Sequence, residues 1–250
     1  MADVNIIRIE NLTKRFDDFT VLDNVSINVK EGENLIVFGR SGTGKSVLLK
    51  CTIGLLKPDG GNIYIKDKNI LELSTKELNK VRKHTSFLFQ SAALYDSMTV
   101  RENLEFPLRK GGYNLSEEEI EERVHKNLEL VSLSEAIDKM PSELSGGMRK
   151  RIGLARAIIT EPEIMFYDEP TTGLDPITSK EISELIINLQ KQLNMTSIVV
   201  THDLICAKII ADRAIFLKDA KVAYEGTLDE LVNSKDKFLQ NFFSVDLINA

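Results

Sequence analysis

One glycine-rich segment constrains the fold of this chain more than any other feature. It reads Gly39-Arg40-Ser41-Gly42-Thr43-Gly44-Lys45-Ser46 and follows directly after the continuously apolar run Leu35–Phe38. Glycines let a backbone wrap closely enough for successive N–H groups to point at phosphate oxygens, and a helix that follows adds its positive N-terminal end. Lys45 can reach the β and γ phosphates of a nucleotide, and the hydroxyl of Ser46 can ligate Mg²⁺. The segment therefore predicts a buried strand, a phosphate-binding loop and a helix over Ser46–Leu56.

Two further runs share the continuous apolar character of Leu35–Phe38, namely Ile164–Tyr167 and Ser197–Val200. Each ends in polar or small residues and precedes a helical pattern, which is typical of parallel strands buried on both faces. Three other runs alternate or nearly alternate, as half-buried strands of an antiparallel sheet do; they are Ile6–Ile9, Val25–Val29 and Asn62–Ile65. The sequence predicts an α/β fold whose ligands gather at the carboxyl ends of the parallel strands.

The stretch from 90 to 160 has a different character because it is rich in helix signals. Ser116-Glu117-Glu118-Glu119 reads as a capping box, and a second helix is expected from about Gly146 to Ile159, before Glu161-Pro162. We interpret residues 90–160 as a helical subdomain inserted in the α/β core of a single domain spanning 1–250, with a C-terminal tail over 234–250.

Bulk composition excludes several classes of protein. The 250 residues are 42% apolar and 28% charged, an ordinary globular mix. No apolar run approaches the ~20 residues of a membrane-spanning helix, the start carries no secretory signal, and the two cysteines suggest neither a disulfide framework nor a metal site. These features predict a cytosolic protein.

The charge balance argues against nucleic acid as a partner. Lys and Arg number 32 against 38 Asp and Glu, a net charge of −6, so the chain lacks the basic field of a typical nucleic-acid binder. The run Met148-Arg149-Lys150-Arg151 is the local exception. We favour a solvated helix face over nucleic-acid contact for this run.

Acidic and polar residues follow the predicted buried strands. Asp168 and Glu169 end Ile164–Tyr167, where Asp168 suits the magnesium shell and Glu169 suits polarising a water molecule. His202 follows Ser197–Val200 at the same edge of the sheet and can hydrogen-bond a γ-phosphate or that water. Gln90, after Phe87-Leu88-Phe89, can touch Mg²⁺ or water, although by itself it would carry no meaning.

A second glycine-rich segment makes the pattern specific. Leu144-Ser145-Gly146-Gly147-Met148 precedes a helix and lies, counted from Ser145, 23 residues before Asp168. With this segment the chain resembles the ATP-binding-cassette (ABC) ATPases over essentially its whole length. The family's adenine-stacking aromatic, P-loop, Q-loop, signature, Walker B pair, D-loop and switch histidine match, in order, Phe16, Gly39–Ser46, Gln90, Leu144–Met148, Asp168-Glu169, Leu174-Asp175 and His202.

This resemblance implies a P-loop NTPase cassette that hydrolyses ATP with Mg²⁺. Its expected architecture is a mixed RecA-like sheet core, an N-terminal antiparallel β part and the inserted helical subdomain. The base-stacking role of Phe16 rests on the resemblance alone, because a lone phenylalanine is more often part of a core. Ser46, Gln90 and Asp168 are the implied magnesium residues.

The resemblance also implies that the chain works as a homodimer. In the family the signature serine and glycines, here Ser145, Gly146 and Gly147, complete the nucleotide site of a second subunit. One P-loop and one signature make a two-fold symmetric dimer the simplest assembly. Glu169 would then position water in each site, and Asp175 would communicate across the interface.

Some details resemble one branch, the ATPase subunits of bacterial Mla/Mce-type phospholipid (toluene-tolerance) transporters. Met148 replaces the commoner glutamine, whose side-chain hydrogen bonds it cannot make. The D-loop Thr172-Gly173-Leu174-Asp175 lacks the frequent Ser-Ala pair, and Phe89–Val100, Met140–Glu143 and Asp175–Thr178 also fit this branch. The branch implies a motor on the cytoplasmic face of the bacterial inner membrane that works with a permease and an MCE lipid-binding protein. The alternative is a signalling or mechanochemical ABC ATPase, of the division type, that regulates a membrane partner without transport.

Two apolar sets stay open to two interpretations each. The first either lines a groove for a permease helix or belongs to the core of the helical subdomain; it comprises Ala92, Ala93, Leu94, Tyr95 and Met98. The second, in the tail, either packs on its own domain or contacts a second subunit; it comprises Phe238, Leu239, Phe242, Phe243, Val245 and Leu247.

Overall fold

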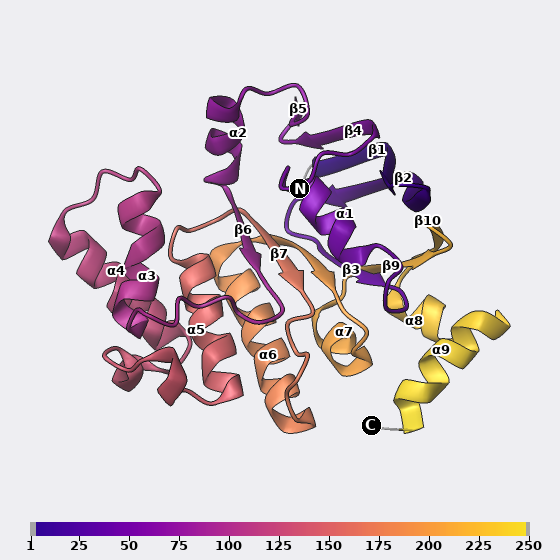
Figure 1. The fold of residues 1–250 in the computed structure, drawn as a ribbon. Coiled ribbons are helices and arrows are strands. Elements are labelled where there is room, and N and C mark those ends of the chain that lie inside the picture. Colours follow the sequence, from indigo (N-terminus) through magenta and orange to yellow (C-terminus); the bar gives the residue numbers. More distant parts are fainter. Residues whose placement is uncertain (1–3, 249–250) are drawn as a thin grey trace.

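The computed structural model describes residues 4–248, with side chains through Ser244. A six-stranded β-sheet runs through the centre of the molecule, and a four-stranded antiparallel sheet lies at the upper right of Figure 1. The six-stranded sheet has the order β10-β9-β3-β8-β7-β6 and is parallel except for β10. Its strands are β3 (Asn34–Phe38), β6 (Thr85–Leu88), β7 (Ile164–Asp168), β8 (Thr196–Val200), β9 (Arg213–Lys218) and β10 (Lys221–Gly226). The antiparallel sheet has the order β2-β1-β4-β5 and comprises β1 (Asn5–Phe16), β2 (Phe19–Lys30), β4 (Gly60–Ile65) and β5 (Lys68–Asn69).

The continuously apolar strands lie where their composition predicts. Every residue of β3, β7 and β8 is buried, because the six-stranded sheet is covered on both faces. Along β3, Leu35 and Val37 join the core shared with the antiparallel sheet, whereas Ile36 and Phe38 join the larger core on the opposite face. The expected α/β fold with a mixed sheet and an N-terminal antiparallel part is confirmed.

Helices cover the two faces unequally (Figure 1). Helix α1 (Lys45–Thr52) packs between the two sheets, where Leu48, Leu49 and Cys51 are fully buried. The opposite face carries most of the remaining helices. The other helices are α2 (Thr75–Arg82), α3 (Val100–Lys110), α4 (Glu117–Leu130), α5 (Gly146–Ile158), α6 (Pro176–Leu193), α7 (Leu204–Ile210), α8 (Leu228–Val232) and α9 (Lys237–Ile248), with short 3₁₀ turns at Ser134–Ala136 and Pro141–Glu143.

The capping box before α4 is confirmed. The N–H of Ser116 donates to the Glu119 carboxylate at 2.7 Å, and the N–H of Glu119 donates to the Ser116 hydroxyl at 3.2 Å. The end of α1 was predicted wrongly, because the helix stops at Thr52 and not at Leu56. Gly54 adopts a left-handed φ of +69°, and the N–H groups of Leu55 and Leu56 turn back to the carbonyl of Lys50, as at a glycine-terminated helix end.

The basic run 148–151 is not a uniformly solvated face. Arg149 is exposed, but Lys150 is only 5% exposed. The expectation of a solvated helix face is therefore wrong for Lys150, which lies on the side of α5 that packs against the sheet. Its ammonium group contacts the backbone of Gln90 and of Glu169.

The apolar tail forms α9 and packs on its own domain. Leu239 and Phe243 are each 1% exposed and belong to the larger core, and the ring of Phe243 lies 5.4 Å from that of Phe38. The side chains of Val245 and Leu247 lie outside the described residues. Among the described residues, no helix has both the length and the apolar character required to cross a membrane.

Candidate active site

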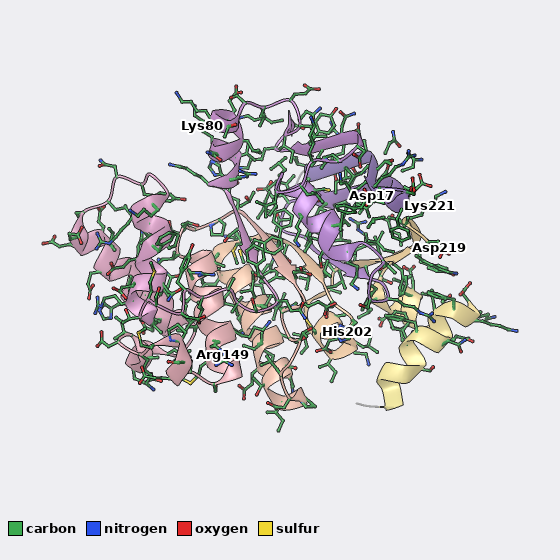
Figure 2. All side chains as sticks on the ribbon, viewed as in Figure 1. Asp17, Lys80, Arg149, His202, Asp219 and Lys221 are labelled. Carbon is green, nitrogen blue, oxygen red and sulfur yellow. The ribbon has the colours of Figure 1, made fainter. Side chains whose placement is uncertain are left out.

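A cleft of about 740 Å³ opens at the carboxyl edge of the six-stranded sheet. Loop residues 39–42 and 44–47 form one wall, and Gln90, Glu169 and His202 line the rest together with Val21, Thr172, Asn241 and Phe242. The loop follows β3, Gln90 follows β6, Glu169 follows β7 and His202 follows β8; Figure 2 shows His202 at the lower end of the sheet. Four strand ends thus bring the sequence-predicted polar groups to one place, as parallel strands do.

The loop is shaped by glycines whose conformations a side chain would strain. Gly42 and Gly44 have φ values of +80° and +95°. A Cβ added at Gly44 would meet both Val21 Cγ1 and the carbonyl oxygen of Val21 at 2.8 Å. Thr43 is not part of the cleft lining; its hydroxyl donates to the Arg40 carbonyl at 2.9 Å and closes the turn.

Lys45 is held in the cleft by its own loop. Its ammonium donates to the carbonyls of Gly39 (2.8 Å) and Arg40 (3.2 Å) and lies 3.9 Å from Oε1 of Glu169. Burial lowers the pKa of Lys45, and the nearby carboxylates of Glu169 and Asp168 oppose that shift. A positive charge placed among backbone donors makes this wall of the cleft suited to phosphate groups.

Ser46 and Asp168 form a hard-ligand pair. The Ser46 hydroxyl donates to Oδ1 of Asp168 at 2.8 Å, although 122 residues separate them, and Asp168 is 8% exposed. A hydroxyl and a carboxylate are oxygen ligands of the kind that Mg²⁺ prefers. Ser46 and Gln90 line the cleft, whereas Asp168, bonded to Ser46, is not among the lining residues. Together these three side chains offer oxygen ligands that fit a magnesium ion bound next to substrate phosphates.

Glu169 is held by contacts to its carboxylate and to its backbone N–H, which donates to the Val200 carbonyl at 2.9 Å. Nδ1 of His202 lies 2.8 Å from Oε2, and the Thr172 hydroxyl donates to the same oxygen at 3.3 Å. The backbone of Glu169 has a left-handed φ of +51°, a conformation that costs a non-glycine residue about 1–3 kcal/mol and persists where the surroundings determine it. A carboxylate held in this way at the cleft suits the orientation of a water molecule.

The signature and D-loop residues do not join this cleft. Within the described residues, its lining includes none of Ser145, Gly146, Gly147 and Asp175. Ser145 is the N-cap of α5, where its hydroxyl accepts the N–H of Met148 at 3.2 Å. Asp175 caps α6 by accepting the N–H groups of Ile177 and Thr178, each at 3.1 Å.

Phe16 also lies outside the cleft lining. It ends β1, is 45% exposed, and has Lys14 Nζ 5.2 Å from its ring centroid. Exposure of the ring at a strand end neither confirms nor contradicts adenine stacking, so this role of Phe16 stays a prediction.

Several contributions to the site were not predicted, among them Val21 of β2. Helix α9 brings Asn241 and Phe242 to the cleft, and no sequence pattern connects this tail with the loop. From α5, the buried ammonium of Lys150 donates to the carbonyl of Gln90 and, at 3.3 Å, to the carbonyl of Glu169. Burial lowers the pKa of Lys150 to about 8, against the opposing effect of Glu169 and Asp168.

Comparison with known proteins agrees with this geometry. The family model described as "ABC transporter" matches residues 22–172. The chain is 44% identical over 232 residues to the intermembrane phospholipid transport system ATP-binding protein MlaF of Haemophilus influenzae, covering 93% of this chain and 88% of that protein. It is 39% identical to the "Probable ribonucleotide transport ATP-binding protein mkl" of Mycobacterium leprae, covering 95% of this chain and 68% of that protein.

A solved structure shares the fold. The dimeric structure of an ATP-binding cassette in a post-hydrolysis state, bound to ADP and Pi, superposes with a TM-score of 0.81 at 35% identity, covering 89% of this chain and 98% of that one. The chain belongs to the ABC transporter family, and it is an ATP-hydrolysing cassette of that family.

Proposed function

We propose that this chain is the motor subunit of a bacterial transporter that moves phospholipid between the membranes of the envelope. The observation that supports the motor role is the convergence of Lys45, Ser46 and the Glu169–His202 pair on one cleft, with Asp168 bonded to Ser46. The phospholipid cargo is supported by the 44% identity to MlaF, which extends over 88% of that protein. A signalling role without transport is not favoured by these relatives.

Each group of side chains has a separate role in ATP hydrolysis. The loop N–H groups and Lys45 bind the β and γ phosphates of ATP. Ser46, Asp168 and Gln90 would hold Mg²⁺, which when bound neutralises charge on those phosphates. Glu169 orients the attacking water and accepts a hydrogen bond from it, and His202 holds Oε2 of Glu169 in place through the 2.8 Å contact.

The second half of each site comes from another copy of the chain. Ser145 and Gly146 are exposed at the N-terminal end of α5, where backbone donors and the helix dipole favour a phosphate. At Gly147, an added Cβ would lie 2.7 Å from Thr178 Cγ2, so a larger residue would displace this end of α5. In the two-fold dimer that we propose, each Ser145 faces the partner's ATP and Asp175 lies at the interface.

The transporter requires membrane partners. A permease would anchor the dimer at the cytoplasmic face of the inner membrane, and an MCE-type protein would carry the lipid. Tyr95 (44% exposed) and Ala93 are available on the surface beyond Gln90 for a permease helix, whereas Ala92 is 1% exposed and belongs to the core. The groove and the core interpretations of this apolar set therefore each describe part of it.

Two substitutions test the motor role. Glu169→Gln is expected to lower ATP turnover at least about 100-fold, to leave ATP affinity within about threefold, and to accumulate an ATP-dependent dimer in size-exclusion chromatography. Lys45→Ala is expected to abolish measurable ATP binding. Glu184→Gln on α6, where the carboxylate is 52% exposed, is the matched control. Normal turnover by Glu169→Gln, or unchanged ATP affinity in Lys45→Ala, would contradict the assignment.

The cargo requires a separate experiment. The chain should be purified with its membrane partners, and the bound small molecules identified by mass spectrometry. Phospholipid together with an MCE-type subunit is the expected result. A complex that holds a nucleotide cargo, or that contains neither phospholipid nor an MCE-type subunit, would overturn the phospholipid assignment and leave the ATPase assignment intact.

A further inference from the structure

Lys150 is a buried lysine whose hydrogen bonds go to backbone carbonyls. It is 5% exposed, and burying an ammonium group is unfavourable unless its surroundings compensate for the lost hydration. Its Nζ donates to the carbonyl of Gln90 and to the carbonyl of Glu169. An apolar side chain of similar length would fill the same space without this penalty, so the donor itself needs an explanation.

The two carbonyls belong to adjacent strand ends. Strands β6 and β7 are parallel neighbours, with Leu88 opposite Tyr167, and Gln90 and Glu169 each follow two residues later. One ammonium therefore bridges the ends of both strands. These two residues are also the ones assigned to magnesium and to the attacking water.

The contact to Glu169 acts on a strained backbone. Glu169 has a φ of +51° and precedes Pro170, a position at which the chain normally prefers extended conformations. Its N–H donates to the Val200 carbonyl at 2.9 Å, its carbonyl accepts from Lys150, and its carboxylate meets His202. The Glu169 carbonyl also accepts the N–H of Thr172 at 3.3 Å, but Thr172 is in the loop that follows Glu169, so among these donors Lys150 is the one that ties this carbonyl to helix α5.

Ser145 lies at the N-terminal end of the same helix. Lys150 lies five residues after this N-cap, or about 7.5 Å along the axis of a helix with 1.5 Å rise per residue. Because a helix moves as a rigid element, displacing the Ser145 end also displaces Nζ of Lys150 relative to the strand ends. In the dimer of the proposed function, on which this inference rests, the Ser145 end contacts the partner's ATP.

We propose that Lys150 is a positioning residue that couples helix α5 to hydrolysis: through its hydrogen bonds to the carbonyls of Gln90 and Glu169, it makes the geometry of one site depend on the engagement of Ser145 with the ATP of the other. It does not touch substrate. It acts through the backbone that aims Glu169.

The test compares Lys150→Met, which keeps the length and removes the donor, with Lys150→Arg, which keeps a charged donor. Lys191→Met, an exposed lysine in the last turn of α6, is the matched control. The measurements are kcat, KM and the Hill coefficient for ATP, ATP affinity, melting temperature, and ATP-dependent dimer formation in a Glu169→Gln background.

Lys150→Met is expected to lower kcat about 10- to 100-fold, as a misplacement of about 1 Å does, with ATP affinity and KM within about twofold and a Hill coefficient closer to one. Dimer formation in the Glu169→Gln background should persist, and Lys150→Arg should restore most of kcat. Should Lys150→Met not fold, Lys150→Leu, which also lacks a donor, is measured in its place with the same expectation.

Wild-type kcat and cooperativity in the donor-deficient variant would overturn the coupling. So would a loss of kcat that Lys150→Arg fails to restore, or one matched by an equal loss of ATP affinity, because these outcomes describe a residue needed only for structure. Glu169→Gln and Lys45→Ala are assayed in parallel, so that failure of the coupling can be distinguished from failure of the proposed function. If these two variants also show wild-type turnover and ATP affinity, the proposed function fails. If only the Lys150 variants show wild-type kcat and cooperativity, the coupling alone fails.

Discussion

Two glycines of the phosphate-binding loop allow a matched substitution experiment. Gly42 and Gly44 both have left-handed φ values, +80° and +95°, but their surroundings differ. An added Cβ at Gly44 would lie 2.8 Å from Val21 Cγ1 and 2.8 Å from the Val21 carbonyl oxygen, whereas among the described residues an added Cβ at Gly42 meets nothing within 4 Å. Alanine at either position therefore strains the backbone, but only Gly44→Ala also creates a steric conflict.

The magnitudes follow from these contacts. A left-handed conformation costs an L-residue roughly 1–2 kcal/mol, and that strain is common to both variants. Overpacking against a neighbour adds about 1–3 kcal/mol, and at Gly44 the neighbour is backbone that cannot rotate away. We expect Gly42→Ala to lower the free energy of unfolding by about 1–2 kcal/mol and Gly44→Ala by about 2–5 kcal/mol. Because Val21 also lines the cleft, Gly44→Ala should additionally weaken ATP binding at least about tenfold, or about 1.4 kcal/mol.

Urea unfolding gives the stability of each variant, and calorimetric titration with ATP gives the affinity. Adding Val21→Ala to Gly44→Ala removes the Cγ1 contact but leaves the carbonyl contact, so it should restore only part of the loss. Equal destabilisation by Gly42→Ala and Gly44→Ala would refute the steric argument, and full recovery on adding Val21→Ala would show that the backbone contact does not matter.

Three further predictions follow from the structure. Cys51 and Cys206 are fully buried, and burial raises their thiol pKa to about 11 and about 12, so at pH 8 roughly one thiol in a thousand or fewer is the reactive thiolate; Ellman's reagent should label neither in the native protein and both in urea, and fast native labelling would contradict the burial. Asp203→Ala removes the cap of α7 and the acceptor of the Thr171 hydroxyl, so it should lower the free energy of unfolding by about 2–4 kcal/mol in urea titrations, with Asp203→Asn losing less. Ser46→Ala should raise the Mg²⁺ concentration for half-maximal turnover about tenfold or more, and an unchanged Mg²⁺ dependence would remove Ser46 from the metal site.

The gathering of the polar groups in the cleft was predictable. The glycine-rich loop, Gln90, Glu169 and His202 each follow a run of strand-type apolar residues, and strands with that composition are parallel and end at one edge. No three-dimensional information was required, because strand direction alone brings these ends together. The same reasoning predicted both sheets.

Features that depend on docking between distant segments were not predictable. The arrival of Asn241 and Phe242 at the cleft depends on how α9 packs against Phe38 and Phe216, and periodicity within the tail does not show where a helix docks. The early end of α1 is a different kind of error, since Gly54 was a visible signal for termination and the apolar residues after it, Leu55 and Leu56, concealed that signal.

The burial of Lys150 was predictable from helical spacing, although the sequence analysis did not predict it. The buried positions of α5 include Ile158 and Leu154, and counting back by four residues from Ile158 reaches Leu154 and then Lys150 on the same stripe. The basic run obscures this helical spacing, because three adjacent cationic residues suggest that all three side chains are exposed to solvent. Helical geometry forbids that for a helix with one buried face, because neighbouring residues point in different directions. A lysine at a core position breaks a local rule of the fold, and such violations concentrate at functional or strained sites. Here the violation lies beside the strained backbone of Glu169, whose carbonyl accepts a hydrogen bond from Lys150.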